Sequence, residues 1–321
     1  MANDEGSDES LELSVWTWFK LRIPAIIIVA LFGDAARSKR KLRALSDSAT
    51  HKALTGDVLT EDEQLVHDLD MASARKAHQR LLETGARAAE IIEQEPRLLS
   101  GHVEGQPTPE PQVPNDGWSD RYREGAKLHA EPDVREMWAR ILAGEVTKPG
   151  SFAFKTLSVL KDVDTESAQK FASLLGFAVN KQGLPAANEF QQHYAPLGVT
   201  YLDLLRLAEL GLIAFPAGSA ITETSPPLML EGRGGYVFAL HERQQPVNVH
   251  TLTRAGQELA LVTDSKTTQA AVVALAEWLT PKCARLQVGF RIDPDHVFAR
   301  DWSPDVLTVD EGTGNARFSK P

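Results

Sequence analysis

The chain has 321 residues, of which 42% are hydrophobic and 24% charged, an ordinary globular composition with enough length for about two domains. Its formal net charge of −10 argues against wholesale nucleic-acid binding, because neutralising phosphates requires a cationic surface. A lone cysteine, Cys283, excludes an intramolecular disulfide, and the acidic leading residues are unlike a secretory signal peptide.

The first predicted element combines aromatic residues, an apolar run and clustered positive charge. Two tryptophans precede the apolar run 23–32, and a cationic block follows at 37–43. Membrane interfaces select this combination, so residues 1–35 are predicted to form a membrane-interacting helix. The residues expected to anchor it are Trp16, Trp18, Phe19, Ile26, Ile27, Ile28 and Phe32.

The length and charges of this helix leave three interpretations open. The strictly apolar run has ten residues, about half of what a bilayer core requires, and extending it back to Leu11 brings in Lys20 and Arg22. The helix spans the membrane within a homo-oligomer, lies in the interface, or packs inside a soluble protein. If it spans, Lys20 and Arg22 face a pore or the headgroups. The residues expected on anionic lipid are Arg37, Lys39, Arg40, Lys41 and Arg43.

A helical segment is predicted over residues 36–100. Thr60 and Glu63 form a capping box, after which apolar residues recur at helical spacing until Pro96. Residues 101–116 then hold four prolines, a composition typical of an extended linker. This linker is the clearest domain boundary in the sequence.

A helical domain is predicted over residues 117–190. Pro132 suits the first turn of a helix, and Gly144 suits its C-terminal cap. Between them an apolar stripe recurs at helical spacing, formed by Val134, Met137, Trp138, Ile141 and Leu142. Asp164 is predicted to cap the next helix.

Three stretches of sequence are similar to a bacterial family. They are 138–145 (WARILAGE), 149–152 (PGSF) and 252–259 (LTRAGQEL). Together they resemble a domain-of-unknown-function family related to the abortive-infection Abi-alpha proteins, over residues 118–263. The resemblance implies a phage-defence or stress effector that acts at the membrane, and it assigns no catalytic residue.

The region 191–300 is predicted to form a winged-helix-like α+β module, followed by a loose tail over 301–321. Thr200 suits the cap of a helix, Tyr201–Leu210, and strands are expected on both sides of the turn Glu231–Gly235. A further strand at 247–252 and a helix capped by Thr253 complete the order. This order raises a rival hypothesis, a DNA-binding regulator.

The helix that would enter the DNA groove disfavours this rival. Its only cation is Arg206, which stands near Asp203 and Glu209, and most of its other residues are apolar. Such a helix suits packing or oligomerisation better than phosphate contact. The turn Glu231–Gly235 is instead a candidate contact for a small ligand or a partner.

The sequence contains no catalytic, metal or cofactor signature. His-Glu-x-x-His, Cys-x-x-Cys, a P-loop and Gly-x-Ser-x-Gly are all absent. No catalytic residue, metal ligand or cofactor is therefore assigned, and enzyme activity is not expected.

The predicted fold class is mainly α, with an N-terminal membrane-interacting helix, a helical middle and a winged-helix-like α+β end. The functional hypothesis is a membrane-associated homo-oligomeric effector in anti-phage or stress defence, with an ion-conducting pore as one form of it. Its expected partners are the bilayer, further copies of itself, and a regulatory protein or small ligand. Since the cationic block follows the apolar run, the bulk of the chain is expected on the cytoplasmic side of a bacterial inner membrane. A soluble DNA-binding regulator and a non-catalytic scaffold are the alternatives.

Overall fold

The computed structural model describes the chain from residue 61 onward, with several gaps. The described ranges are 61–95, 110–214, 219–221, 227–265, 267–293, 296–303, 307–309 and 316–318. They fall into two compact units, one within residues 1–161 and the other within residues 162–321. The predicted membrane-anchoring and lipid-contacting residues, from Trp16 to Arg43, lie outside the described ranges.

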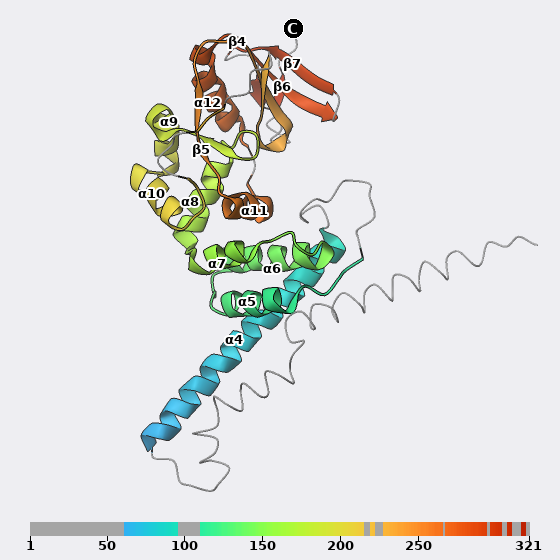
Figure 1. Cartoon of the computed structure of the whole chain (residues 1–321), viewed down its shortest axis with the longest axis vertical. Helices are drawn as coiled ribbons and strands as arrows, with labels where there is room; N and C mark the ends of the chain where they lie inside the picture. Colours follow the sequence, from blue (N-terminus) through green and yellow to red (C-terminus); the bar gives the residue numbers. More distant parts are fainter. Residues whose placement is uncertain are drawn as a thin grey trace, which may run out of the picture. The chain divides into compact units, whose positions relative to one another are not determined.

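The first unit is built from helices (Figure 1). They are α4 (Glu61–Gln94), α5 (Asp116–Ala126), α6 (Pro132–Thr147) and α7 (Phe154–Asp162). Helix α4 packs along α6 and buries Ile91 and Ile92. The two helices are also joined by an ion pair, in which Arg87 Nε donates to Glu136 Oε2 at 2.9 Å.

Helix α6 provides the core of the first unit. Its predicted apolar face is confirmed, since all five residues of the stripe are buried: Val134, Met137, Trp138, Ile141 and Leu142. The Trp138 ring meets Tyr122 edge-on at 5.2 Å, and the Tyr122 hydroxyl donates to the Trp138 carbonyl at 2.9 Å. The predicted helix end at Gly144 is wrong, because the helix continues through Val146 and Thr147, which are both buried.

The second unit begins with helices around a small antiparallel sheet. The helices are α8 (Thr165–Leu175), α9 (Ala187–Tyr194), η2 (Ala195–Leu197), α10 (Tyr201–Glu209) and α11 (Arg254–Val262). The sheet has the order β1-β5-β2, formed by β1 (Gly183–Pro185), β5 (Val247–Thr251) and β2 (Ser219–Ile221). The central strand β5 places His250 opposite Leu184 of β1 and Asn248 opposite Ala220 of β2.

The predicted helix caps of this unit are confirmed. Asp164, Thr200 and Thr253 precede α8, α10 and α11, and each side chain accepts a hydrogen bond from a backbone N–H of the first helical turn. A cap of this kind satisfies a donor that has no partner within the helix. These three helix starts are therefore local consequences of the sequence.

A second, four-stranded antiparallel sheet follows, with the order β3-β4-β6-β7. Its strands are β3 (Leu228–Glu231), β4 (Tyr236–Arg243), β6 (Cys283–Asp293) and β7 (His296–Asp301), and η3 (Arg233–Gly235) joins β3 to β4. Helix α12 (Gln269–Leu279) lies against this sheet and is followed by η4 (Thr280–Lys282) (Figure 1). In the segment predicted to be a tail, β8 (Leu307–Val309) pairs with β9 (Ala316–Phe318).

The predicted fold class, mainly α with a winged-helix-like end, is wrong. The hairpin expected to form a wing belongs instead to the four-stranded sheet, where Phe238 faces Val288 and Leu240 faces Leu286. All four side chains are buried: β6 pairs with β4 along its edge, and helix α12 packs against both strands. The second unit is therefore an α+β domain with two sheets.

The predicted N-terminal membrane-interacting helix, residues 1–35, lies outside the described ranges. Within the described ranges, no helix is both long enough and apolar enough to cross a bilayer. The longest helix described, α4, is rich in charged residues.

Candidate functional site

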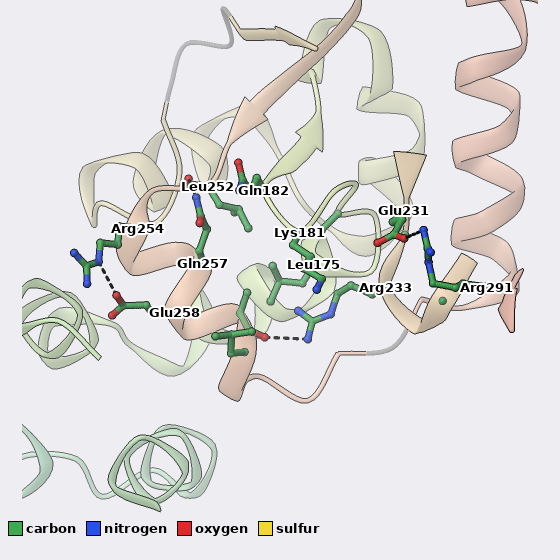
Figure 2. Close-up of a pocket in the computed structure, with 15 residues that line it drawn as sticks. Leu175, Lys181, Gln182, Glu231, Arg233, Leu252, Arg254, Gln257, Glu258 and Arg291 are labelled. Atoms are coloured by element: carbon green, nitrogen blue, oxygen red, sulfur yellow. Dashed lines mark hydrogen bonds and ion pairs between the residues drawn. The ribbon is translucent and has the colours of Figure 1, made fainter. Parts of the chain in front are cut away.

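The second unit contains a pocket of about 790 Å³ (Figure 2). It lies among the end of α8, the turn that precedes β1, the β3–η3 segment, helix α11 and strand β6. Its apolar lining consists of Leu175, Ala178, Leu252, Ala260 and Leu261. Its charged lining consists of Lys181, Glu231, Arg233, Arg254, Glu258 and Arg291.

Helix α11 supplies one wall of the pocket. Gly256 allows the helix to approach the end of α10 closely, because a Cβ atom there would lie 2.0 Å from the Leu212 carbonyl oxygen. Ala255, Leu259 and Val262 are buried on one side of the helix. Helical spacing then presents the other side to the pocket, including Arg254, Gln257, Glu258 and Leu261.

A tight turn brings Lys181 to the pocket. Asn180 and Lys181 both have positive φ angles, of 50° and 58°, and the Gln182 N–H donates to the Val179 carbonyl at 3.2 Å. This left-handed conformation is costly for residues other than glycine, by about 1 kcal/mol or more each. The turn is held to β3 twice, since Asn180 N donates to the Glu231 carbonyl at 2.7 Å and Asn180 Oδ1 accepts from Glu231 N at 2.8 Å.

Arg233 is positioned by the C-terminal end of α11. Its Nη2 atom donates to the Ala260 carbonyl at 2.9 Å and to the Thr263 carbonyl at 3.3 Å. Carbonyls at a helix C-terminus carry partial negative charge and favour a cation. Burial lowers the pKa of Arg233, an effect that the nearby Asp264 opposes. In the part of the chain that the structure describes, no carboxylate forms an ion pair with Arg233.

The two glutamates of the pocket each face an arginine. Glu258 Oε1 accepts from Arg254 Nε at 2.8 Å, and Glu231 forms an ion pair with Arg291. Lys181 differs, because it makes no hydrogen bond or ion pair with any residue in the described ranges. The four cations and two carboxylates of the lining leave an excess of two positive charges.

The pocket lining has no serine, threonine, cysteine or histidine, but it contains the carboxylates of Glu231 and Glu258 and the amine of Lys181. Carboxylates and lysines can take part in proton transfer as well as in binding. Over the described residues, no cluster of three or more histidine, cysteine, aspartate or glutamate side chains is arranged to hold a metal ion. Cys283 is buried, and burial raises the pKa of its thiol.

The stretch 138–145 lies in helix α6, and 149–152 forms the loop that follows this helix. Glu145 accepts hydrogen bonds from the Gly150 N–H at 2.7 Å and from the Phe152 N–H at 3.0 Å. Trp118 Nε1 donates to the Phe152 carbonyl at 3.0 Å. The stretch 252–259 behaves differently, since it caps α11 and also lines the pocket.

Sequence reasoning found only part of this pocket. The turn Glu231–Gly235 was expected to contact a small ligand or partner, and it does line the pocket. Lys181, Arg254 and Arg291 were missed, because they are single charged residues on three separate elements. The pair Asn180-Lys181 after a helix is the one local signal of a turn, since asparagine tolerates positive φ.

A comparison with known families matches residues 76–276 to "Protein of unknown function (DUF2806)", which is more than half of the chain. The chain belongs to this family. The resemblance to a family of unknown function is thereby confirmed. The matched region includes every residue that lines the pocket except Arg291. Neither the curated proteins nor the solved structures searched contain a match.

Proposed function

We propose that this DUF2806 protein is a non-catalytic, ligand-responsive protein whose second unit binds a small molecule in the pocket. The observation that supports this proposal is the cavity of about 790 Å³, with apolar walls and a few converging charged groups. Small-molecule sites in proteins commonly measure roughly 300–1,000 Å³ and share this combination of apolar walls and few polar groups.

The positions of the charged residues support binding by a prebuilt site. Arg233 is held by two helix-terminal carbonyls, and Lys181 is carried by a turn that Asn180 ties to β3. Because the Arg233 side chain and the backbone that carries Lys181 are held before a ligand arrives, less conformational entropy is lost on binding.

The proposal is tested by filling the pocket. Leu261 lines the pocket and is 54% exposed, so Leu261→Trp is expected to narrow the cavity without disturbing the core. Leu202→Trp is the matched control, because Leu202 is 72% exposed on α10 and outside the pocket. The full-length protein and both variants are screened by thermal shift against phosphorylated, carboxylated and neutral small metabolites.

At least one compound is expected to raise the melting temperature of the wild type and of Leu202→Trp, but not that of Leu261→Trp. A panel in which no compound separates Leu261→Trp from its control contradicts the proposal.

A second candidate function is the membrane-associated homo-oligomeric effector, with defence against phage as its context. What supports it is sequence alone: the tryptophans, apolar run and cationic block between Trp16 and Arg43. The link to the Abi-alpha proteins rests on the three similar stretches and belongs to this same candidate. After cell lysis the full-length protein is expected in the membrane pellet, and to remain there in high salt. Recovery in the supernatant at low salt would remove this candidate.

The DNA-binding alternative receives less support from the described residues. Arg206 is the only cation on α10, and it forms ion pairs with Asp164 and with Glu166. A cation engaged by two carboxylates is poorly placed to neutralise a phosphate.

A further inference from the structure

We infer that the pocket recognises a phosphate monoester of a small soluble molecule, and that Lys181 and Arg233 bind its phosphate group. This inference rests on the proposed function, because it names the ligand class of the same pocket. It follows from the charge balance of the lining, from the donors that remain available, and from the apolar walls.

The charge balance favours a ligand with about two negative charges. Glu231 is paired with Arg291, and Glu258 is paired with Arg254. Lys181 and Arg233 are then the cations of the lining that form no ion pair with a glutamate of the pocket. Asp264, outside the lining, lies near Arg233 without forming an ion pair with it. A phosphate monoester carries roughly −1.5 to −2 charges at neutral pH, whereas a carboxylate carries only one. The monoester is therefore the simplest group that balances both cations.

The available donors fit an oxyanion. Arg233 uses Nη2 for the two carbonyls, so its Nε and Nη1 atoms have no hydrogen-bond partner within the described residues. Lys181 adds the donors of its ammonium group, and Figure 2 shows both side chains directed toward the part of the pocket near Leu175. Guanidinium and ammonium groups form short, charge-assisted hydrogen bonds with phosphate oxygens.

The carbonyls at the end of α11 restrict where the anion can lie. Ala260 and Thr263 present partial negative charge, which repels an anion placed directly beside them. Arg233 stands against these carbonyls and screens them. The phosphate is therefore expected on the side of the guanidinium that faces away from α11 and toward Lys181.

The apolar walls indicate that the rest of the ligand is uncharged. Leu175, Leu252 and Leu261 line the same pocket, and they favour an apolar or aromatic body. A pyrophosphate or triphosphate would bring more negative charge than the two unneutralised cations balance. Inorganic phosphate would leave the apolar walls uncovered, so it is expected to bind more weakly than a monoester.

The test is calorimetric titration of the full-length protein with two matched pairs of probes. The pairs are phenyl phosphate with phenol, and adenosine 5′-monophosphate with adenosine. At least one monoester is expected to bind, with its dephosphorylated partner weaker by at least about tenfold. Raising the salt concentration is expected to lower the affinity for the monoester and to leave the affinity for its neutral partner unchanged.

Variants separate a role in binding from a role in folding. Lys181 is exposed and makes no hydrogen bond or ion pair in the described ranges, so Lys181→Gln is expected to fold normally. The affinity of this variant for the monoester is expected to be lower by at least about tenfold. Lys148→Gln, at an exposed position in the first unit, is the control and is expected to bind like the wild type. Arg233→Lys is expected to retain more affinity for the monoester than Arg233→Gln does, because lysine keeps the positive charge.

Three results would overturn the inference: no binding of either monoester by the wild type, equal binding of phenol or adenosine, or unchanged affinity in Lys181→Gln. The outcome for the proposed function is read separately. Suppose that Leu261→Trp abolishes binding of a neutral or carboxylated compound and that Lys181→Gln leaves this binding unchanged. The pocket is then a binding site, and only the phosphate assignment fails.

Discussion

A single glutamate of α9 joins this helix to three other elements of the second unit. Glu189 of α9 accepts hydrogen bonds from Lys282 Nζ at 2.6 Å, Asn248 Nδ2 at 2.6 Å and Trp278 Nε1 at 3.0 Å. Burial raises the pKa of Glu189, but the hydrogen bonds from Lys282, Asn248 and Trp278 outweigh it, so the pKa lies below its usual value. Glu189 is therefore ionised at neutral pH, and it neutralises a lysine that is almost fully buried.

Removing this carboxylate is expected to destabilise the second unit. Glu189→Ala leaves the buried ammonium of Lys282 without its counterion, which typically costs about 3 kcal/mol in the free energy of unfolding. Glu277→Ala, at an exposed position on α12, is the control and is expected to change stability by less than about 0.5 kcal/mol. Urea denaturation measures both, and an equal effect of the two substitutions would show that the ion pair contributes nothing.

A second buried residue makes stability depend on pH. His250 of β5 is 2% exposed, its Nε2 atom accepts from the Ala187 N–H at 3.0 Å, and burial lowers its pKa to about 4 from the ordinary 6.5. Between these two values the unfolded chain binds a proton that the folded chain does not. Stability is therefore expected to fall as pH decreases from 6.5 toward 4, by on the order of 2–3 kcal/mol in total.

Urea denaturation at several pH values tests this dependence. His250→Gln keeps an acceptor but cannot be protonated, so it is expected to flatten the pH dependence in that window. His78→Gln, at an exposed position on α4, is expected to leave it unchanged. A His250→Gln profile that parallels the wild type would mean that other groups control the acid sensitivity.

At the scale of elements, a close approach of backbones positions the pocket wall. Gly256 in the first turn of α11 lies against Leu212, whose carbonyl oxygen would be 2.0 Å from an added Cβ atom. Because backbone atoms cannot move aside as a flexible side chain can, α11 must shift to accept any larger residue. This contact couples the placement of α11, and hence of Arg254 and Leu261, to the end of α10.

Gly256→Ala is expected to reduce the free energy of unfolding by at least about 2 kcal/mol. Gly117→Ala is the matched control in the first turn of α5, where the nearest neighbour of an added Cβ is the Asn115 side chain at 3.3 Å. This control is expected to stay within about 1 kcal/mol of the wild type, since alanine also favours a helix. Similar stabilities of the two variants would contradict the close approach.

Helix ends that depend on interactions between residues close in the sequence were predicted correctly, and an end that depends on tertiary packing was not. The caps Asp164, Thr200 and Thr253 were predicted because a cap acts within three residues of its own position. The end of α6 was misplaced at Gly144, because the burial of Val146 and Thr147 extends the helix. Tertiary packing thus overrode a local stop signal.

At the scale of the whole described molecule, the pocket is assembled from segments that are distant in the sequence. Its lining residues come from the segments 175–182, 231–235 and 252–261 and from residue 291. The Asn180–Glu231 hydrogen bonds join the first two segments, and the Arg233 contacts with Ala260 and Thr263 join the second to the third. A bound ligand would therefore contact several elements at once.

Ligand binding is accordingly expected to protect these segments together. In the presence of saturating phenyl phosphate, backbone hydrogen exchange is expected to slow in 179–183, 233–235 and 254–262, because opening any of them would release the ligand. Exchange in 84–94 of α4, which contributes nothing to the pocket, serves as the internal reference. Protection confined to one segment, or absent from all three, would contradict a shared site.

The sequence by itself determined the helical stripe of α6, the caps of α8, α10 and α11, and the strands around the turn Glu231–Gly235. These features depend on residues a few positions apart, so local spacing is enough to predict them. The same local reasoning predicts that residues before residue 44 contact a membrane; they lie outside the described ranges, so this stays a prediction.

Only the tertiary structure decided that the β3–β4 hairpin belongs to a four-stranded sheet and that Lys181 and Arg233 face one cavity. Strand pairing and pocket formation join residues from tens to just over a hundred positions apart. Their free energy comes from burying apolar surface between elements, which depends on how the elements pack and not on the order of residues within any one of them.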